Sequence, residues 1–133
     1  MRRLIVGLSL ALLCAGLHAQ TMNLRGTIPF AFRAGDTQMP AGDYTIRHSA
    51  NQLILHKEGG GPSVLLLTIA ASRPNALSEE RLSFNRYGER YFLSSVWTSE
   101  SREGREVPKS RAEKEVARQA GLPQSAGVVL KRQ

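Results

Sequence analysis

Apolar residues recur at every second position over most of residues 23–97, and glycine, proline and asparagine residues separate the alternating segments. Alternation with period two is typical of strands that bury one face, and regularly spaced turn residues are typical of consecutive antiparallel strands. The pattern therefore predicts an all-β fold, a small antiparallel sandwich or partly open barrel of about six or seven strands. The expected strands are 24–32, 44–48, 52–57, 63–70, 81–85 and 90–97, with 126–131 as an optional last one.

Turn residues support these boundaries. Gly35 and Asp36 follow the first strand, and Pro40-Ala41-Gly42 precedes the second. Proline presets φ at a corner, whereas glycine accepts a φ that a Cβ would resist. Residues 86–89, with glycine at position 88, predict a hairpin between the strands 81–85 and 90–97. The second of these strands is apolar on both faces, so the pattern leaves open whether its even-numbered or odd-numbered residues face the core.

The composition changes after Trp97. Of the 20 residues from Ser99 to Arg118, 11 are charged, with both signs mixed, so this stretch is expected to bury little. Residues 99–121 are predicted to be a charged linker and a C-terminal helix that begins after Ser110 as N-cap and ends at Gly121. This assigns 20–98 to the β-domain and leaves 122–133 as a tail or a short final strand.

The first 19 residues resemble a cleaved export signal. Two arginines precede an apolar run at 4–17, and Ala19 offers a cleavage point before Gln20. The run is shorter than the ~20 residues that cross a bilayer as a helix, so we expect no transmembrane segment in the mature chain. The predicted mature protein is periplasmic or secreted and has 114 residues (133 − 19). Its formal charge is +5, because the full chain carries +7 and Arg2 and Arg3 are removed.

The mature chain offers little for catalysis. The only cysteine, Cys14, lies in the export signal, which excludes disulfides and thiol chemistry from the mature form. If residues 49–51 form the turn between two strands, His48 and His56 share a face but lie too far apart for one metal ion. If the turn also includes Gln52, the pairing shifts by one residue and His56 moves to the opposite face. We expect no metal, no cofactor and no catalytic residue.

Positive charge suggests an anionic partner. The arginines after residue 100 alternate with glutamates, which weakens any long-range field, and export argues further against nucleic acid. A more compact arginine cluster surrounds the predicted hairpin turn. It has tyrosines close by, and we predict partner binding there: Arg81, Arg86, Tyr87, Arg90 and Tyr91. The expected partner is an anionic glycan, a lipid headgroup or an acidic envelope protein, since guanidinium groups bind such oxygens bidentately.

Several motifs resemble a group of small exported proteins of acidobacteria. They are Pro29-Phe30-Ala31-Phe32, Pro40-Ala41-Gly42-Asp43-Tyr44, Phe84-Asn85-Arg86-Tyr87-Gly88 and the following charged helix. The resemblance covers most of the mature chain. It implies export and a β-rich fold, and it implies no activity, ligand or catalytic residue.

Three functions follow from these patterns. The leading hypothesis is a non-catalytic cell-envelope protein with a binding or structural role, using the arginine-bearing hairpin or an open sheet edge. The alternative is a carrier of a small hydrophobic ligand, in which aromatic residues line a cavity: Phe30, Phe32, Tyr44, Phe84, Phe92 and Trp97. A hydrolase would require a serine or carboxylate within hydrogen-bond reach of His48 or His56 in a cleft.

Overall fold

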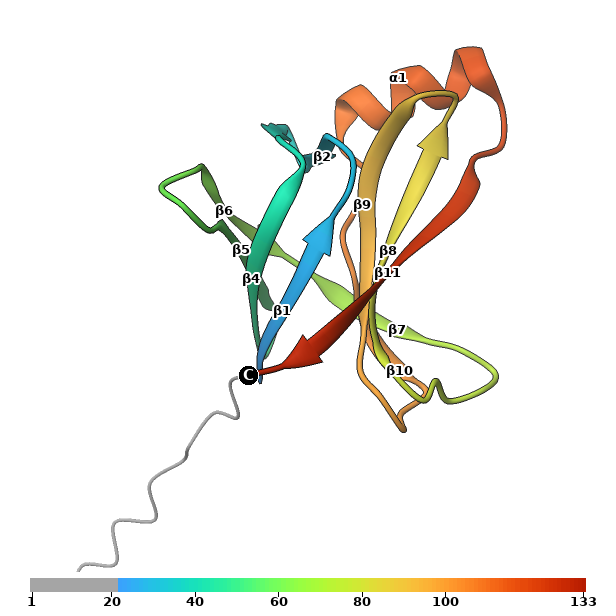
Figure 1. Ribbon diagram of the computed structural model, residues 1–133. Coiled ribbons are helices and arrows are strands. Elements are labelled where there is room, and N and C mark those ends of the chain that lie inside the picture. The colour runs from blue at the N-terminus through green and yellow to red at the C-terminus, as the bar shows by residue number, and fades with distance from the viewer. Residues whose placement is uncertain (1–21) are drawn as a thin grey trace, which may run out of the picture.

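The computed structural model describes residues 22–133, so the expected export signal lies outside the described residues. These residues form a strongly curved, barrel-like sheet with one short helix on its outside (Figure 1). The prediction of a mostly antiparallel β fold is confirmed. The elements are β1 (Met22–Ile28), β2 (Phe32–Ala34), β3 (Thr37–Met39), β4 (Gly42–Ser49), β5 (Gln52–Lys57), β6 (Ser63–Leu67), β7 (Ile69–Ser72), β8 (Glu80–Tyr87), β9 (Arg90–Trp97), β10 (Glu103–Glu106), α1 (Arg111–Ala120) and β11 (Gln124–Arg132).

The predicted number of strands, about six or seven, is wrong, because the described residues contain eleven. Two of the expected strands are divided. The first breaks after Ile28 at Pro29, whose fixed φ and missing N–H interrupt a ladder, and the chain resumes as the small hairpin β2–β3. The strand expected at 63–70 bends at Thr68 into β6 and β7. β10 lies in the segment expected to be a linker, and β11 lies in the segment expected to be a tail or a short final strand.

The sheet is nearly closed into a barrel. Its strands follow the order β3-β2-β9-β8-β11-β1-β4-β5-β6, and β10 pairs with both β7 and β9. β6 pairs with β5, and β7, the next segment of the chain, pairs with β10. The continuous segment β6–β7 therefore links β5 to β10. The circuit β1-β4-β5-β6/β7-β10-β9-β8-β11 therefore returns to β1. At its end, Gln133 N–H donates to the Asn23 carbonyl at 3.1 Å, which joins the last residue to the first strand.

The bend at Thr68 is held by two neighbouring segments. Thr68 N–H donates to the Asn51 carbonyl at 2.8 Å, on the β5 side. On the β10 side, Arg105 Nη2 donates to the Thr68 carbonyl at 2.7 Å and Arg105 Nε donates to Thr68 Oγ1 at 3.0 Å. Thr68 is buried, and an unpaired buried carbonyl is costly. The arginine thus satisfies the backbone group that the strand exposes as it changes neighbours.

The hairpin predicted around Gly88 is confirmed. Gly88 has φ 63°, and the Tyr87↔Arg90 pair encloses a two-residue turn. The register shifts between Ser83 and Phe84, where Ser95 and Leu93 are their partners, so β9 holds one extra residue. This bulge explains the ambiguous apolar pattern of β9, because Phe92 and Leu93 are both buried. Neither the even-numbered nor the odd-numbered residues alone face the core.

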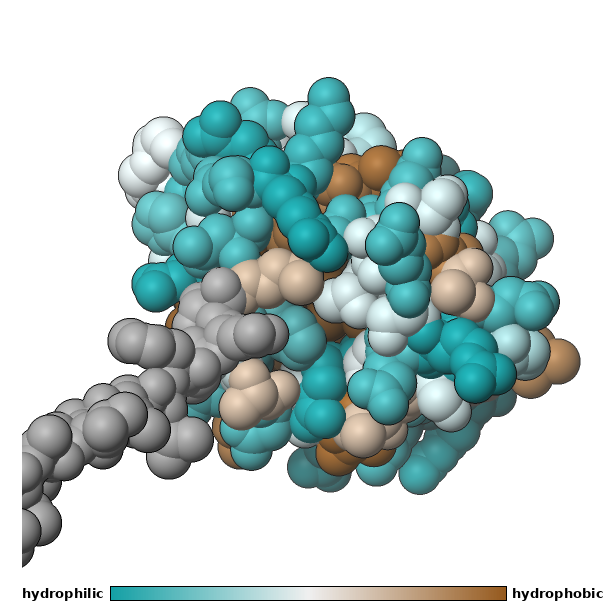
Figure 2. All heavy atoms as spheres, turned by 90° about the horizontal axis from the view of Figure 1, so that it is seen from below, coloured by the Kyte–Doolittle hydropathy of each residue, from teal (hydrophilic) through white to brown (hydrophobic). Residues whose placement is uncertain are grey.

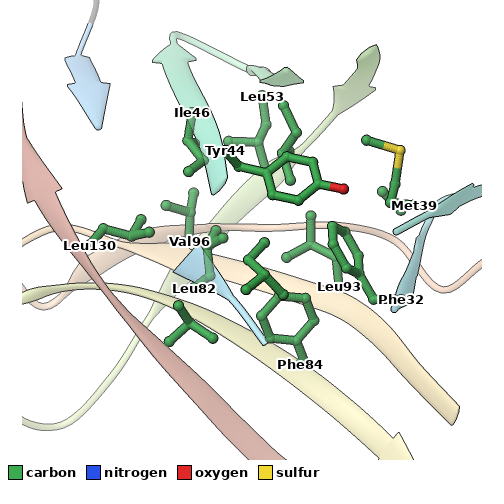
Figure 3. Close-up of a cluster of buried hydrophobic side chains, with 14 of the residues drawn as sticks. Phe32, Met39, Tyr44, Ile46, Leu53, Leu82, Phe84, Leu93, Val96 and Leu130 are labelled. Carbon is green, nitrogen blue, oxygen red and sulfur yellow. The ribbon is translucent and has the colours of Figure 1, made fainter. Parts of the chain in front are cut away.

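The core fills the inside of the barrel. Side chains from strands far apart in sequence converge there, as Figure 3 shows for Tyr44, Leu82 and Phe84 among others. The Phe32 ring lies 5.5 Å from Tyr44 and 5.3 Å from Phe84, both in edge-to-face geometry. Leu24, Ile28, Ile46, Leu53, Leu55 and Val96 are completely buried. Four of the six aromatic residues that would line a cavity in a carrier are packed into or against this core: Phe30, Phe32, Tyr44 and Phe84. Phe92 packs against Tyr87 instead, and Trp97 lies under the Arg73 guanidinium group.

Residues after 98 contribute to this core, contrary to the expectation that they bury little. Val107, Val128 and Leu130 are buried in the same cluster. β11 pairs with β8 from Gln124↔Arg86 to Leu130↔Glu80 and then with β1 at two positions. The segment expected to be a tail or a short final strand is thus a nine-residue strand inside the sheet.

The helix begins and ends where the sequence predicted. Ser110 Oγ accepts the Glu113 N–H at 3.2 Å, and Gly121 follows the last helical residue with φ 80°. Helix α1 lies across the end of the β8–β9 hairpin (Figure 1). Seen from below, the surface is mainly hydrophilic, with small separate hydrophobic patches (Figure 2). The helix found within residues 22–133 is too short and too polar to span a bilayer.

Candidate functional site

The structure divides the five residues predicted to bind a partner. Arg81 lies opposite Trp97 in the hairpin, whereas Arg86 lies five residues further along β8. Successive side chains of a strand point to opposite faces, so Arg81 and Arg86 face opposite sides of the sheet, about 17 Å apart along the strand. Arg90 and Tyr91 lie at the turn end with Arg86. The predicted cluster is therefore two separate groups, one at each end of the hairpin.

Tyr87 has a structural role. Its side chain is 5% exposed, and its hydroxyl donates to Glu113 Oε2 in α1 at 2.9 Å. Asn85 Nδ2 donates to the same oxygen at 2.9 Å. Burial, together with the Glu113 carboxylate, raises the pKa of Tyr87 to about 12. Glu113 is itself buried, so these two bonds dock the first turn of the helix onto the outside of β8.

Arg86 and Tyr91 belong to an aromatic stack at the same end of the hairpin. The Tyr91 ring stacks on Phe30 with centroids 3.8 Å apart, and Arg86 Cζ lies 5.4 Å from the Tyr91 centroid. Arg86 Nε donates to the Gly88 carbonyl at 2.7 Å. These contacts fix the Tyr91 ring, so that it forms a rigid wall rather than a mobile side chain.

A surface groove joins Arg90 and Tyr91 to residues that the sequence did not indicate. It has a volume of about 490 Å³ and lies between β2, the β8–β9 turn and α1. Phe32, Phe92 and Val116 contribute apolar surface to it. The polar side chains that line it are Arg33, Gln38, Glu89, Arg90, Glu115 and Gln119.

The two arginines of the groove are available to a ligand. Among residues 22–133, neither Arg33 nor Arg90 has a carboxylate within 4.0 Å, and neither side chain donates a hydrogen bond. The carboxylate of Glu115 lies 3.8 Å from Arg111, one helical turn away. The amides of Gln38 and Gln119 can both donate and accept hydrogen bonds. The groove thus offers two guanidinium groups and two amides beside a fixed aromatic wall.

A second arginine cluster lies at the other end of the hairpin. The Arg73 guanidinium carbon lies 3.7 Å from the centre of the Trp97 ring, and Arg81 is opposite Trp97 in the ladder. Burial and the nearby Arg81 lower the pKa of Arg73. The Nε atoms of both arginines are buried without a hydrogen-bond partner among the described residues. None of its three residues lines the groove that contains Arg90, or two further surface grooves that contain Asp43 and His48.

The two histidines follow the second of the two registers considered from the sequence. His48 pairs with Leu53 and His56 with Thr45, which places the two rings on opposite faces. His48 lines a groove with Arg105, and burial with the Arg105 charge lowers its pKa. His56 Nδ1 contacts Ser63 Oγ across the β5–β6 ladder. This contact is exposed, and neither residue lines the grooves that contain Arg90, Asp43 and His48.

No three histidine, cysteine, aspartate or glutamate side chains cluster as metal ligands within residues 22–133. Comparison of the chain with protein-family models, with curated proteins and with solved structures gave no match. The resemblance to exported acidobacterial proteins stays a prediction, and a function has to be argued from the groove itself.

Proposed function

We propose that this protein is a non-catalytic binding protein of the cell envelope and that its ligand is an acidic glycan. The groove between β2, the hairpin turn and α1 is the binding site. The observation that carries the proposal is the placement of Arg33 and Arg90 in one groove, where neither has a carboxylate partner among residues 22–133.

The chemistry of the lining favours carboxylated sugars. A guanidinium group binds a carboxylate through two parallel hydrogen bonds, and two of them in one groove suit a ligand with repeated carboxylates. Gln38 and Gln119 suit the hydroxyl groups between those carboxylates. Glu89 and Glu115 line the same groove, and their carboxylates can accept hydrogen bonds from sugar hydroxyl groups. Their negative charge also disfavours the binding of a highly charged polyphosphate.

Binding can be measured by isothermal titration calorimetry with an oligosaccharide of uronic acids and a neutral oligosaccharide of the same length. The protein should bind the acidic oligosaccharide, and binding should weaken as salt increases. Arg33→Gln and Arg90→Gln each remove one charge-assisted contact, of about 1.5–3 kcal/mol, so each should weaken binding by about tenfold to a hundredfold.

Arg102→Gln is the matched control, since Arg102 is exposed and lies outside the groove. It removes the same charge and should leave the affinity unchanged. An equal loss of affinity in Arg33→Gln, Arg90→Gln and Arg102→Gln would point to a general charge effect. Equal affinity of the wild type for the acidic and the neutral oligosaccharide would refute the acidic-glycan proposal. Binding to anionic lipid vesicles alone would also refute it, in favour of a headgroup ligand.

The cell-envelope location is part of the proposal. It rests on the basic start, the apolar run and the cleavage point within residues 1–20. Mass spectrometry of the exported chain should show Gln20 as the first residue. Retention of Met1, or a lipid on Cys14, would contradict cleavage after Ala19.

A further inference from the structure

β6 lies at one end of the strand order, and β3 of the small hairpin β2–β3 lies at the other end. Within residues 22–133, β6 pairs with β5 alone. Lys57 N–H donates to the Pro62 carbonyl and Thr68 N–H donates to the Asn51 carbonyl, in the same register as the β5–β6 ladder. In an antiparallel ladder only every second residue directs its backbone groups to a given neighbour. Ser63, Leu65 and Leu67 therefore direct theirs away from β5.

In the described part of the chain, no strand pairs with these outward backbone groups. Ile69, two residues after Leu67, pairs with Glu106 of β10. The β10–β7 ladder ends there, and Pro108, two residues after Glu106, is not paired with Leu67. Within residues 22–133 no backbone hydrogen bond joins Ser63, Leu65 or Leu67 to a partner on that side. A strand added there would form the bonds that the barrel lacks.

The same edge exposes apolar side chains. Leu65, Leu67 and Ile69 are 54%, 63% and 54% exposed and follow one another along the outer face. Ile54, the partner of Leu65 in β5, adds a half-buried side chain beside them. Soluble proteins protect such edges with charges, proline or a bulge, but β6 contains no charge or proline and pairs with β5 in a continuous register.

Charge indicates which partner fits. No charged residue occurs between Glu58 and Arg73, although the chain as a whole carries a formal charge of +7. Two copies of a cationic protein repel each other least when they meet at surface segments that carry no charge. A two-fold axis at Leu65 would place Leu65 opposite its own copy and Ser63 opposite Leu67, with about six backbone hydrogen bonds. The edge is thus complementary to itself in hydrogen bonding, hydrophobicity and charge.

We propose that the protein forms a two-fold homodimer by antiparallel pairing of β6 with β6 of a second copy. The paired strands join the two barrels into one continuous sheet, and the exposed leucines of both copies become neighbours. One five-residue edge is smaller than a standard interface, so the dimer should dissociate in about the micromolar range. This proposal is independent of the glycan-binding groove.

Sedimentation velocity of the mature chain over a wide concentration range tests the dimer. Wild-type protein should show a monomer–dimer equilibrium. Leu65→Pro removes only an outward N–H, so the β5 ladder should persist while the dimer is lost. Leu65→Lys should also yield monomer, because it places two lysines directly opposite each other at the two-fold axis. Circular dichroism spectra establish whether each variant is folded, and Leu65→Lys decides the question if Leu65→Pro is not.

Val129→Lys is the matched control, since Val129 is 49% exposed on the outer face of another strand. It should dimerise as the wild type does. Leu65→Cys provides a test of symmetry: the two Cα atoms would lie about 5.5 Å apart, within the range of a disulfide. Mild oxidation should give a covalent dimer of Leu65→Cys and leave Val129→Cys without a covalent cross-link. A wild type that is monomeric at all concentrations, open filaments, or equal loss in Val129→Lys would overturn the proposal.

Discussion

Gly42 begins β4 with φ 151°, a backbone conformation that residues with a Cβ rarely adopt. A Cβ at this position would also meet Lys57 Cε at 2.9 Å, although the end of a lysine side chain can move. Gly42→Val should therefore lower the free energy of unfolding mainly through backbone strain, by about 1–3 kcal/mol. Urea unfolding followed by circular dichroism measures the change.

Ala41→Val is the control for Gly42→Val. Ala41 is exposed, so its change should alter the free energy of unfolding by less than about 0.5 kcal/mol. Equal stability of Gly42→Val and the wild type would mean that the backbone at residue 42 relaxes without cost.

Single residues were predictable where their type determines local geometry. Gly42, Gly88, Ser110 and Gly121 all have the turn or cap roles expected of them. The candidate site was less predictable. Alternation along β8 already implied that Arg81 and Arg86 face opposite sides, a signal present in the sequence. Arg33 had no such signal, since it reaches the groove only because β2 pairs with β9, 59 positions further on (92 − 33).

At the scale of elements, α1 shows that helix formation and helix docking depend on different information. Its ends follow from Ser110 and Gly121, whereas its position depends on Tyr87 and Asn85, which lie in β8. The sequence around Tyr87 and Asn85 contains no pattern that predicts contact with a helix. Glu113 lies in the charged stretch that was expected to bury little, but it is buried and attaches the helix to β8.

The Tyr87–Glu113 bond predicts a pH dependence of stability. The pKa of Tyr87 rises from 10.0 to about 12 on folding, first because the hydroxyl is buried and then because of Glu113. Since the folded pKa is the higher one, the contribution of the neutral phenol is complete below pH 10 and is lost as the pH rises through 12. The free energy of unfolding, measured with urea at a series of pH values, should fall over this interval.

Tyr87→Phe should remove that part of the pH dependence. Below pH 10 it should also be less stable than the wild type by about 1.5–3 kcal/mol, because the Glu113 carboxylate loses a hydrogen bond. Tyr91→Phe is the control, as the Tyr91 hydroxyl has no hydrogen bond within residues 22–133. An identical alkaline decline in Tyr87→Phe and the wild type would contradict the assignment.

At the scale of the whole molecule, the barrel is closed by segments that look dispensable in sequence. The strand pattern before residue 98 predicted the β class, because local alternation is enough to identify amphipathic strands. β10 and β11 are rich in charged, glycine and small residues, so their hydrophobic signal is weak. Their strand conformation depends on pairing with β7, β8 and β9, and such pairing is not recorded in the local sequence.

This closure predicts that the chain cannot lose its last twelve residues. β11 lies between β8 and β1 and supplies Val128 and Leu130 to the core. Burial of two such side chains contributes about 3–6 kcal/mol, and the ladder with β8 adds to it, against a total stability of about 5–15 kcal/mol for a typical domain. A chain that ends at Gly121 should therefore be largely unfolded by circular dichroism, with no cooperative thermal transition. Removal of Gln133 alone costs one backbone bond and should leave the transition intact. A cooperative transition in the shorter chain would show that the remaining strands close the core without β11.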